Sequence, residues 1–198
     1  NITLIGDLKE ENLISKDIGP GNCLIDEWMR RNKKANYDKN GEAASIGKTN
    51  KLILNQALEN FENITDKNIN SFDVNDFEIN FLRGLDLEDG ASTITDFTSN
   101  IIASKLLNEI RKSDLKISKI ILCGGGRKNK TLIERLKKYC GNKIKFETMD
   151  DYGIDGDFVE SQAFAFLAIR SYFKLPISFP NTTGCKLPST GGILVKNF

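Results

Sequence analysis

Histidine is absent from this sequence of 198 residues. Without it, the chain cannot form a Ser-His-Asp or Cys-His triad, a zincin motif or a histidine proton shuttle. The cysteines are far apart and form no CxxC pair, which excludes the usual zinc and thioredoxin-type motifs; they are Cys23, Cys123, Cys140 and Cys185. Any acid–base chemistry must therefore use carboxylates, lysine, tyrosine or a thiol.

An excess of one charge is also missing. Lys and Arg number 28 against 27 Asp and Glu, a net charge of +1, which supports neither a nucleic-acid-binding stripe nor a polybasic membrane patch. No apolar run approaches the roughly 20 residues needed to span a bilayer, and no signal peptide precedes the first strand-like segment. Scattered, reduced thiols fit the cytoplasm. Because the chain starts at Asn1 and is strand-like within three residues, we expect a fragment or a trimmed chain.

The order of the segments predicts an α/β fold. Apolar alternation and helical periodicity predict strands at residues 2–5, 13–15, 117–123 and 142–149, and helices starting near residues 22, 42, 51, 89, 130 and 157. Strand–loop–helix repetition favours a layered α/β/α domain with a mixed, largely parallel sheet. The last helix, "FVESQAFAFLAIRSYF", is so apolar that we expect it to lie buried between layers. Residues 65–77 are predicted to form an irregular polar loop.

Three consecutive glycines, Gly124, Gly125 and Gly126, lie between a buried strand and a helix. Open α/β sheets bind ligands beyond the carboxyl ends of their strands, and glycines let the backbone approach a ligand closely. The loop is neither GxGxxG nor a Walker motif, so adenine or ribose is a better candidate than phosphates. The alternative is a tight turn that needs positive φ. Asn129 either caps the following helix or reaches the ligand.

Asp17 lies two residues before Gly19-Pro20-Gly21, which lead into a helix that opens at Asn22. The free N–H groups of a helix N-terminus attract phosphate or a polar ligand. A carboxylate next to such an anion site makes sense as a base that takes a proton from a nucleophile. The alternative is an ordinary turn or capping acid.

Glu160 lies in the first turn of the most apolar helix, on one face with Phe164 and Leu167. It is a candidate site residue. The pattern Asp157-x-x-Glu160 is equally that of a capping box, in which Glu160 accepts from the backbone of Asp157. From spacing alone the two interpretations are open.

Taken together, six segments resemble, in order, the C-terminal two-thirds of the anhydro-N-acetylmuramic acid kinases. The resemblance runs from Asn1 to about Leu194. The segments are "KDIGPGNCLIDEW", "NYDKNGEAASIGK", "GLDLEDGASTITDFTSNIIA", "ILCGGGRKNKTLIERL", "GIDGDFVESQAFAFLAIRS" and "LPISFPNTTGCKLPSTGG".

This resemblance implies a fold of the actin–hexokinase superfamily, with two α/β lobes and with ATP and sugar in the cleft between them. Residues 1–198 would form the C-terminal lobe. The implied reaction is hydrolysis of the 1,6-anhydro bond coupled to phosphorylation at O6, giving N-acetylmuramate 6-phosphate in peptidoglycan recycling. ATP and Mg²⁺ would be the cofactors and 1,6-anhydro-N-acetylmuramic acid the partner; the metal ligands and a homodimeric state are open.

The resemblance also assigns roles to residues. Asp17 matches the aspartate that activates the attacking water, and Glu160 matches a sugar-binding glutamate. Gly124, Gly125 and Gly126 match the loop that receives adenosine, with Asn129 beside it. We also place Asn22, at the helix start next to Asp17, among the substrate-binding residues. Asp17, Glu160 and the glycine loop should then line one side of a common cleft.

The chain departs from the family pattern in two places. The N-terminal Gly-Thr-Ser-x-Asp-Gly phosphate loop is absent, so we expect negligible turnover from residues 1–198 alone. The loop usually written Pro-Pro-Lys-Ser reads Ile69-Asn70-Ser71. Two alternatives stay open: a non-catalytic sugar- or nucleotide-binding module of the same fold, and a glycosidase that uses Asp17 and Glu160 as a carboxylate pair.

Overall fold

The computed structural model of the protein describes residues 1–6, 9, 12–32, 35–65, 78–141 and 144–195. The strands are β1 (Ile2–Leu4), β2 (Ile14–Lys16), β3 (Lys119–Leu122) and β4 (Lys145–Thr148). The helices are α1 (Cys23–Arg31), α2 (Glu42–Ile46), α3 (Lys51–Thr65), α4 (Leu87–Lys112), α5 (Lys130–Cys140), α6 (Val159–Tyr172) and α7 (Pro180–Thr183). Short 3₁₀ turns are η2 (Lys39–Gly41), η4 (Asn80–Leu82), η5 (Gly125–Lys128) and η6 (Met149–Tyr152). Of the polar loop predicted at residues 65–77, residues 66–77 lie outside the described residues, and Thr65 is the last residue of α3.

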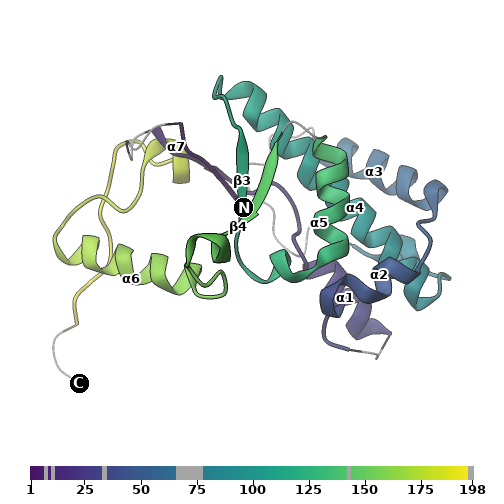
Figure 1. Ribbon diagram of the computed structural model, residues 1–198. Helices are drawn as coiled ribbons and strands as arrows, with labels where there is room; N and C mark the ends of the chain where they lie inside the picture. The colour runs from purple at the N-terminus through teal and green to yellow at the C-terminus, as the bar shows by residue number, and fades with distance from the viewer. Residues whose placement is uncertain (7–8, 10–11, 33–34, 66–77, 142–143, 196–198) are drawn as a thin grey trace.

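The mixed α/β class is confirmed, with helices α1 to α5 on one side of the strands and α6 on the other (Figure 1). Strands β3 and β4 are parallel, with Lys119 opposite Lys145, and helix α5 makes the crossover that parallel strands require. Strands β1 and β2 form a separate antiparallel hairpin in which Ile2 faces Lys16. The strands of the described residues thus form two pairs, one of them parallel, rather than one continuous sheet.

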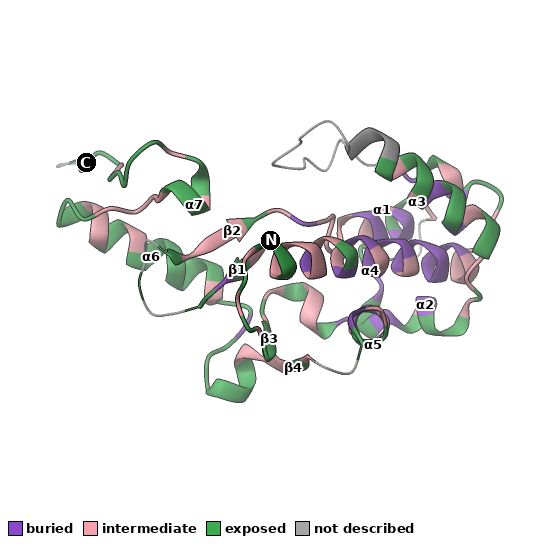
Figure 2. Ribbon diagram, turned by 90° about the horizontal axis from the view of Figure 1, so that it is seen from above, coloured by how far each residue is buried: buried purple, intermediate pink, exposed green. Residues whose placement is uncertain are grey.

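Helix α4 is the centre of the main hydrophobic core. Figure 2 shows its buried residues along much of its length, with α1, α2 and α3 packed around it. Trp28 of α1 lies across the first turns of α4, where a Cβ on Gly90 would come within 2.1 Å of the indole. The indole Nε1 also donates to the carbonyl of Leu87 at 2.9 Å. The absence of a side chain at Gly90 is what allows α1 to pack so closely.

A second core cluster lies beside the candidate site residues. Ile18, which directly follows Asp17, is only 4% exposed and packs with Ala103 and Leu106 of α4 and Leu136 of α5. Removing an isoleucine side chain from water stabilises a fold by about 1.5–3 kcal/mol. Burial of Ile18 therefore fixes the segment between β2 and α1, and with it the position of Asp17.

The prediction that the last helix is buried is wrong. No residue of α6 is buried, and Phe164 is 65% exposed. The reason is topological: the core-forming helices all pack around α4 on the other side of the strands, and no described element covers α6 (Figure 1). A helix that is apolar all round is normally covered by other protein. None of the described helices is both long enough and apolar enough to cross a membrane.

Candidate active site

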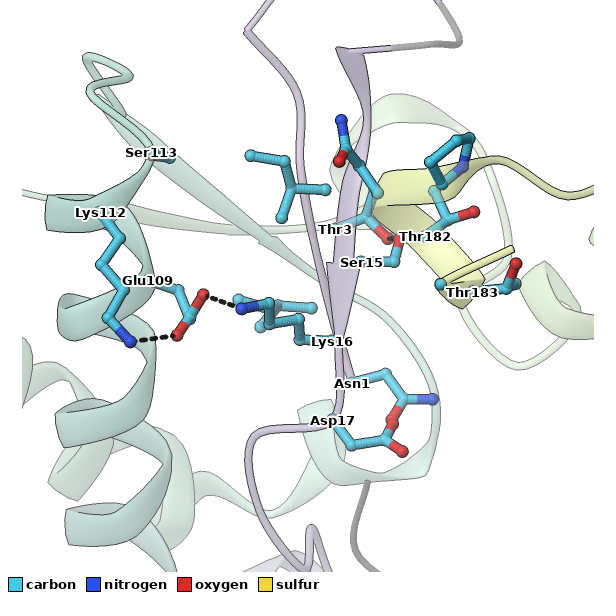
Figure 3. A pocket seen from close by; sticks show the side chains of 15 residues that line it. Asn1, Thr3, Ser15, Lys16, Asp17, Glu109, Lys112, Ser113, Thr182 and Thr183 are labelled. Atoms are coloured by element: carbon cyan, nitrogen blue, oxygen red, sulfur yellow. Dashed lines mark hydrogen bonds and ion pairs between the residues drawn. The ribbon is translucent and has the colours of Figure 1, made fainter. Parts of the chain in front are cut away.

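Asp17 lines a cavity of about 840 Å³, where strand β2 ends. The hairpin β1–β2, the C-terminal end of α4 and helix α7 surround it, and Figure 3 shows Asp17 just below Lys16. The volume is within the range of small-molecule sites. Thr182 and Thr183 of α7 also line the cavity, so its wall carries hydroxyl groups as well as the carboxylate. Such a mixture suits a ligand with several hydroxyl groups.

Lys16 and Glu109 form an ion pair on one wall of this cavity. Lys16 Nζ lies 2.8 Å from Glu109 Oε2, and Lys112 Nζ lies 3.5 Å from Oε1 (Figure 3). Partial burial disfavours the charged form of Glu109, but the hydrogen bond and charge of Lys16, with Lys112, outweigh it and hold its pKa below the ordinary value. Glu109 is therefore an ionised carboxylate at neutral pH. It is poorly suited to be a general acid.

A second cavity, of about 450 Å³, lies between the start of α1, the turn η2 and the glycine loop. Asn22, Gly125 and Asn129 line it, so the structure brings three predicted site residues together. Asp26 and Lys128 also line it. The segment from Asp17 to Asn22 thus connects two cavities, one at each end.

Among the described residues, Asn22 presents an unsatisfied polar atom beside the second cavity. Its Oδ1 atom is buried and has no hydrogen-bond partner in the described part of the chain. Although Asn22 is the N-cap residue of α1, its side chain makes no capping hydrogen bond. A buried acceptor without a donor is costly and calls for an explanation. The structure places Asn22 in the cavity of the glycine loop and not among the residues that line the cavity of Asp17.

The glycine loop combines a backbone requirement with open space. Gly124 has φ 72° and ψ 179°, a conformation essentially restricted to glycine, so the turn interpretation holds for this residue. Gly125 has no such requirement, and a Cβ added there would meet no atom within 4 Å. Neither backbone strain nor packing explains a glycine at position 125. A glycine at this position leaves the adjoining cavity open.

Asn129 caps helix α5, as one of its two predicted roles required. Its Oδ1 accepts from Leu132 N at 3.0 Å, and the residue is 4% exposed. Thr131 then donates its hydroxyl to the carbonyl of Gly41 at 2.7 Å, which ties η2 to α5. The capping hydrogen bond sets one wall of the second cavity.

Asp26 is a residue of the second cavity that the sequence patterns did not single out. Burial raises its pKa above the ordinary value, opposed by the charge of Arg30 and assisted by that of Asp38. A spacing of four residues from Asn22 places both side chains on one face of α1, and this is the signal that could have identified it. Asp38 itself caps α2, accepting from Ala43 N and Ala44 N at 2.9 and 3.0 Å.

The capping-box interpretation of Glu160 is wrong. Helix α6 begins at Val159, its N-cap residue is Phe158, and no side chain caps it. The carboxylate of Asp157 instead accepts from Arg127 Nη1 at 2.5 Å and from Lys128 Nζ. Asp157, the predicted capping acid, is therefore paired with two cationic side chains instead of with the helix backbone.

Glu160 is exposed in the first turn of α6 and lines neither of the two cavities. The common cleft expected for Asp17, Glu160 and the glycine loop stays a prediction. Within the described ranges, no group of three or more Asp, Glu or Cys side chains could hold a metal ion.

Comparison with known proteins identifies the family. The family model described as anhydro-N-acetylmuramic acid kinase matches residues 1–197. A relative of that name from Pelagibacter ubique (strain HTCC1062) is 53% identical over 198 residues, covering 100% of this chain and 53% of the relative. Relatives of the same name from Zymomonas mobilis and Rhizorhabdus wittichii are each 38% identical, covering 97% and 98% of this chain and 50% and 51% of their own lengths.

The chain therefore spans about half the length of these curated relatives, less than the two-thirds expected from the motifs. The match extends over both cavities and over the segment that joins them. The chain belongs to the anhydro-N-acetylmuramic acid kinase family.

Proposed function

We propose that this chain supplies the C-terminal lobe of an ATP-dependent kinase acting on 1,6-anhydro-N-acetylmuramic acid in cytoplasmic peptidoglycan recycling. One observation carries the proposal. The segment from Asp17 to Asn22 joins a cavity lined by a carboxylate and hydroxyls to a cavity lined by the glycine loop. A kinase needs an acceptor site and a nucleotide site that adjoin in this way, with the base between them.

Asp17 is the proposed general base. Its carboxylate takes a proton from water as the water oxygen attacks the anomeric carbon, and the bond from that carbon to O6 of the sugar breaks. The freed O6 is the atom that becomes phosphorylated. Burial of Ile18 supports this role, because it holds the backbone of Asp17 in place beside the cavity. Glu160 is kept as a proposed sugar-binding residue that acts from the start of α6.

The second cavity fits an adenine nucleotide. The unpaired Oδ1 of Asn22 can accept from an amino or hydroxyl group, and Gly125 leaves open space for a flat ring. Asn129 and Lys128 also line this cavity. When bound, ATP supplies the phosphoryl group. We propose that Mg²⁺ arrives with the nucleotide's phosphates rather than in a site built from this lobe's own side chains.

Helix α6 supports the two-lobe proposal. Its apolar side chains are exposed, among them Phe164, Phe166 and Ile169. The relatives contain about as much additional chain again. We propose that the N-terminal lobe packs on α6, which would both bury this surface and complete the nucleotide cleft.

The glycosidase alternative is weaker. A glycosidase needs a second carboxyl group near Asp17 that stays protonated until it gives its proton to the leaving group. The second acid in this cavity is Glu109, whose pKa is held below its ordinary value by Lys16. A non-catalytic binding module would use the same cavities without needing Asp17 as a base.

The proposal can be tested with a chimeric enzyme. The part of the Pelagibacter ubique relative that has no counterpart in this chain is joined, in the relative's own order, to residues 1–198. Release of ADP is measured with ATP and 1,6-anhydro-N-acetylmuramic acid. We expect ADP and phosphorylated sugar in equal amounts from the chimera and negligible amounts from residues 1–198 alone.

The products separate the alternatives. Opened sugar that forms without ATP would establish a glycosidase. Binding of the sugar and nucleotide by a folded chimera that forms no product would favour a binding module. Robust ADP production by residues 1–198 alone would contradict the two-lobe argument.

A further inference from the structure

Arg127 is the most extensively paired side chain beside the glycine loop. Only 6% of its side chain is exposed. Its Nε and Nη2 donate to the two carboxylate oxygens of Asp150 at 2.6 and 3.0 Å, and its Nη1 donates to Asp157 Oδ1 at 2.5 Å. Nη1 also donates to the carbonyl of Gly124 at 3.0 Å. One guanidinium therefore contacts the glycine loop, the turn η6 that follows β4, and the segment that leads into α6.

The backbone is built around this side chain. Gly156 lies against the guanidinium, where a Cβ would come within 2.4 Å of Arg127 Nε. The same residue accepts from Gly124 N at 2.9 Å through its carbonyl. Asp155 adds a third carboxylate, with Oδ1 at 3.6 Å from Nη2. Three acids gathered this closely repel one another unless a cation lies between them.

The fork geometry is specific to arginine. A guanidinium offers parallel N–H groups to a carboxylate and further donors to a third partner, which an ammonium group on a flexible stem cannot reproduce. Arg127 uses this geometry on Asp150 while it still reaches Asp157 and Gly124. Exposed ion pairs contribute little, but the guanidinium of this one is almost fully covered.

We propose that Arg127 is a positioning residue that locks the glycine loop to the start of α6. Gly124 and Glu160 then move as one unit, so binding of an adenine nucleotide at the loop orders the helix that carries the sugar-binding acid. The identities of the ligands, a nucleotide at the loop and a sugar at Glu160, rest on the proposed function. The mechanical link between them rests on the contacts of Arg127 alone.

The link is tested first without any ligand, by amide hydrogen exchange on the 198-residue chain. In Arg127→Met, we expect exchange at Gly124 and Gln162, whose amides donate to Gly156 and Phe158, to speed up together by about tenfold or more. The amide of Gly90 in α4 should not change. Lys145→Met is the matched control, because it removes an exposed cation paired with Glu147 away from the loop.

The second measurement adds ADP to the chimeric enzyme described above, in which both lobes are present. With the wild-type sequence of residues 1–198 and with Lys145→Met, we expect ADP to slow exchange at Gln162. In Arg127→Met, ADP should no longer slow exchange at Gln162. Arg127→Lys should not restore this effect, because an ammonium group lacks the parallel N–H donors of a guanidinium. A merely structural role for Arg127 would leave the effect of ADP on exchange at Gln162 unchanged.

The outcomes are distinct. Unchanged exchange at Gly124 and Gln162 in Arg127→Met, or protection of Gln162 by ADP in that variant, overturns the inference. If Arg127→Met also speeds exchange at Gly90, the variant has lost its fold, and Asp150→Asn replaces it with the same expected pattern. Failure of the chimeric enzyme, which contains both lobes, to bind ADP would contradict the proposed nucleotide site, whereas the ligand-free measurement on residues 1–198 would still decide the link.

Discussion

The side-chain amide of Asn22 lies against the backbone of Gly126, where an added Cβ would be 3.7 Å from Asn22 Nδ2. The two residues are far apart in sequence, yet they bring the start of α1 to the glycine loop. Asn22 Oδ1 nevertheless finds no donor among the described residues. This arrangement therefore holds an acceptor at a cavity wall, ready for a donor from a ligand.

Asn22→Ala should separate ligand binding from stability. Because Asn22 makes no capping hydrogen bond and its buried Oδ1 is unpaired within the described residues, we expect the substitution not to lower the free energy of unfolding in urea by more than about 0.5 kcal/mol. Removal of one hydrogen bond should weaken ADP binding by about fivefold, measured by titration calorimetry. Equal ADP affinity in the variant and the wild type would remove Asn22 from the nucleotide site.

The glycine loop offers a matched pair of substitutions. Gly124→Ala forces a side chain into a conformation with φ 72°, and we expect it to cost about 1–3 kcal/mol of stability. Gly125→Ala places its methyl group in open space, so stability should stay within about 0.5 kcal/mol of wild type. Its ADP affinity should fall all the same, because the methyl group enters the cavity. Unaltered affinity would indicate that the nucleotide does not approach Gly125.

The pairing of Arg127 with Asp150 predicts an acid transition. Hydrogen bonds from Arg127 lower the pKa of Asp150 from 3.8 to about 2. The pKa of Asp157 is also lowered, by hydrogen bonds from Lys128 and Arg127. A carboxylate with a lowered pKa adds stability above its unfolded value, and this contribution declines as the pH falls towards the folded value.

The link between the loop and α6 should therefore persist at about pH 5 and weaken between about pH 4 and pH 2. Carboxyl carbon chemical shifts followed by NMR should give Asp150 a midpoint near 2 in the wild-type chain. Arg127→Met should return this midpoint towards 3.8. A wild-type midpoint close to 3.8 would mean that the ion pair does not form in solution.

Asp17→Asn tests the proposed base in the chimeric enzyme. Asparagine keeps the size and hydrogen bonding of the side chain but cannot take a proton from water. We expect kcat for the coupled reaction to fall by about 10²–10⁴-fold while the anhydro-sugar still binds. Neither opened sugar nor phosphorylated sugar should accumulate.

Glu160→Gln is the comparison, because weakening a ground-state interaction with the sugar should chiefly raise KM. An Asp17→Asn enzyme with near-normal kcat and a raised KM would reduce Asp17 to a sugar-binding residue. The base would then have to be sought among the other residues of the cleft.

The sequence by itself determined the local elements. The hairpin, the long helix and the βαβ unit of β3, α5 and β4 lie where periodicity predicted them, and Asn129 caps α5. Whether a segment forms a helix or a strand depends largely on side-chain spacing within that segment, so the pattern that encodes it is visible in one short stretch. The pairing of β3 with β4, in which Lys119 lies opposite Lys145, is not local in this sense.

Tertiary structure decided where the site residues meet. Asp157 matched a capping pattern, but its carboxylate accepts a hydrogen bond from Arg127, 30 residues away. Helix α6 begins at Val159, with Phe158 as its N-cap residue. Asn22 lies with the glycine loop because α1 and η5 are brought together by packing on α4 and α5. The apolar pattern of α6 calls for a covering surface, but whether one is present depends on which elements lie beside the helix. Such packing depends on contacts between segments that are far apart in the sequence, and the spacing of residues within one segment does not specify those contacts.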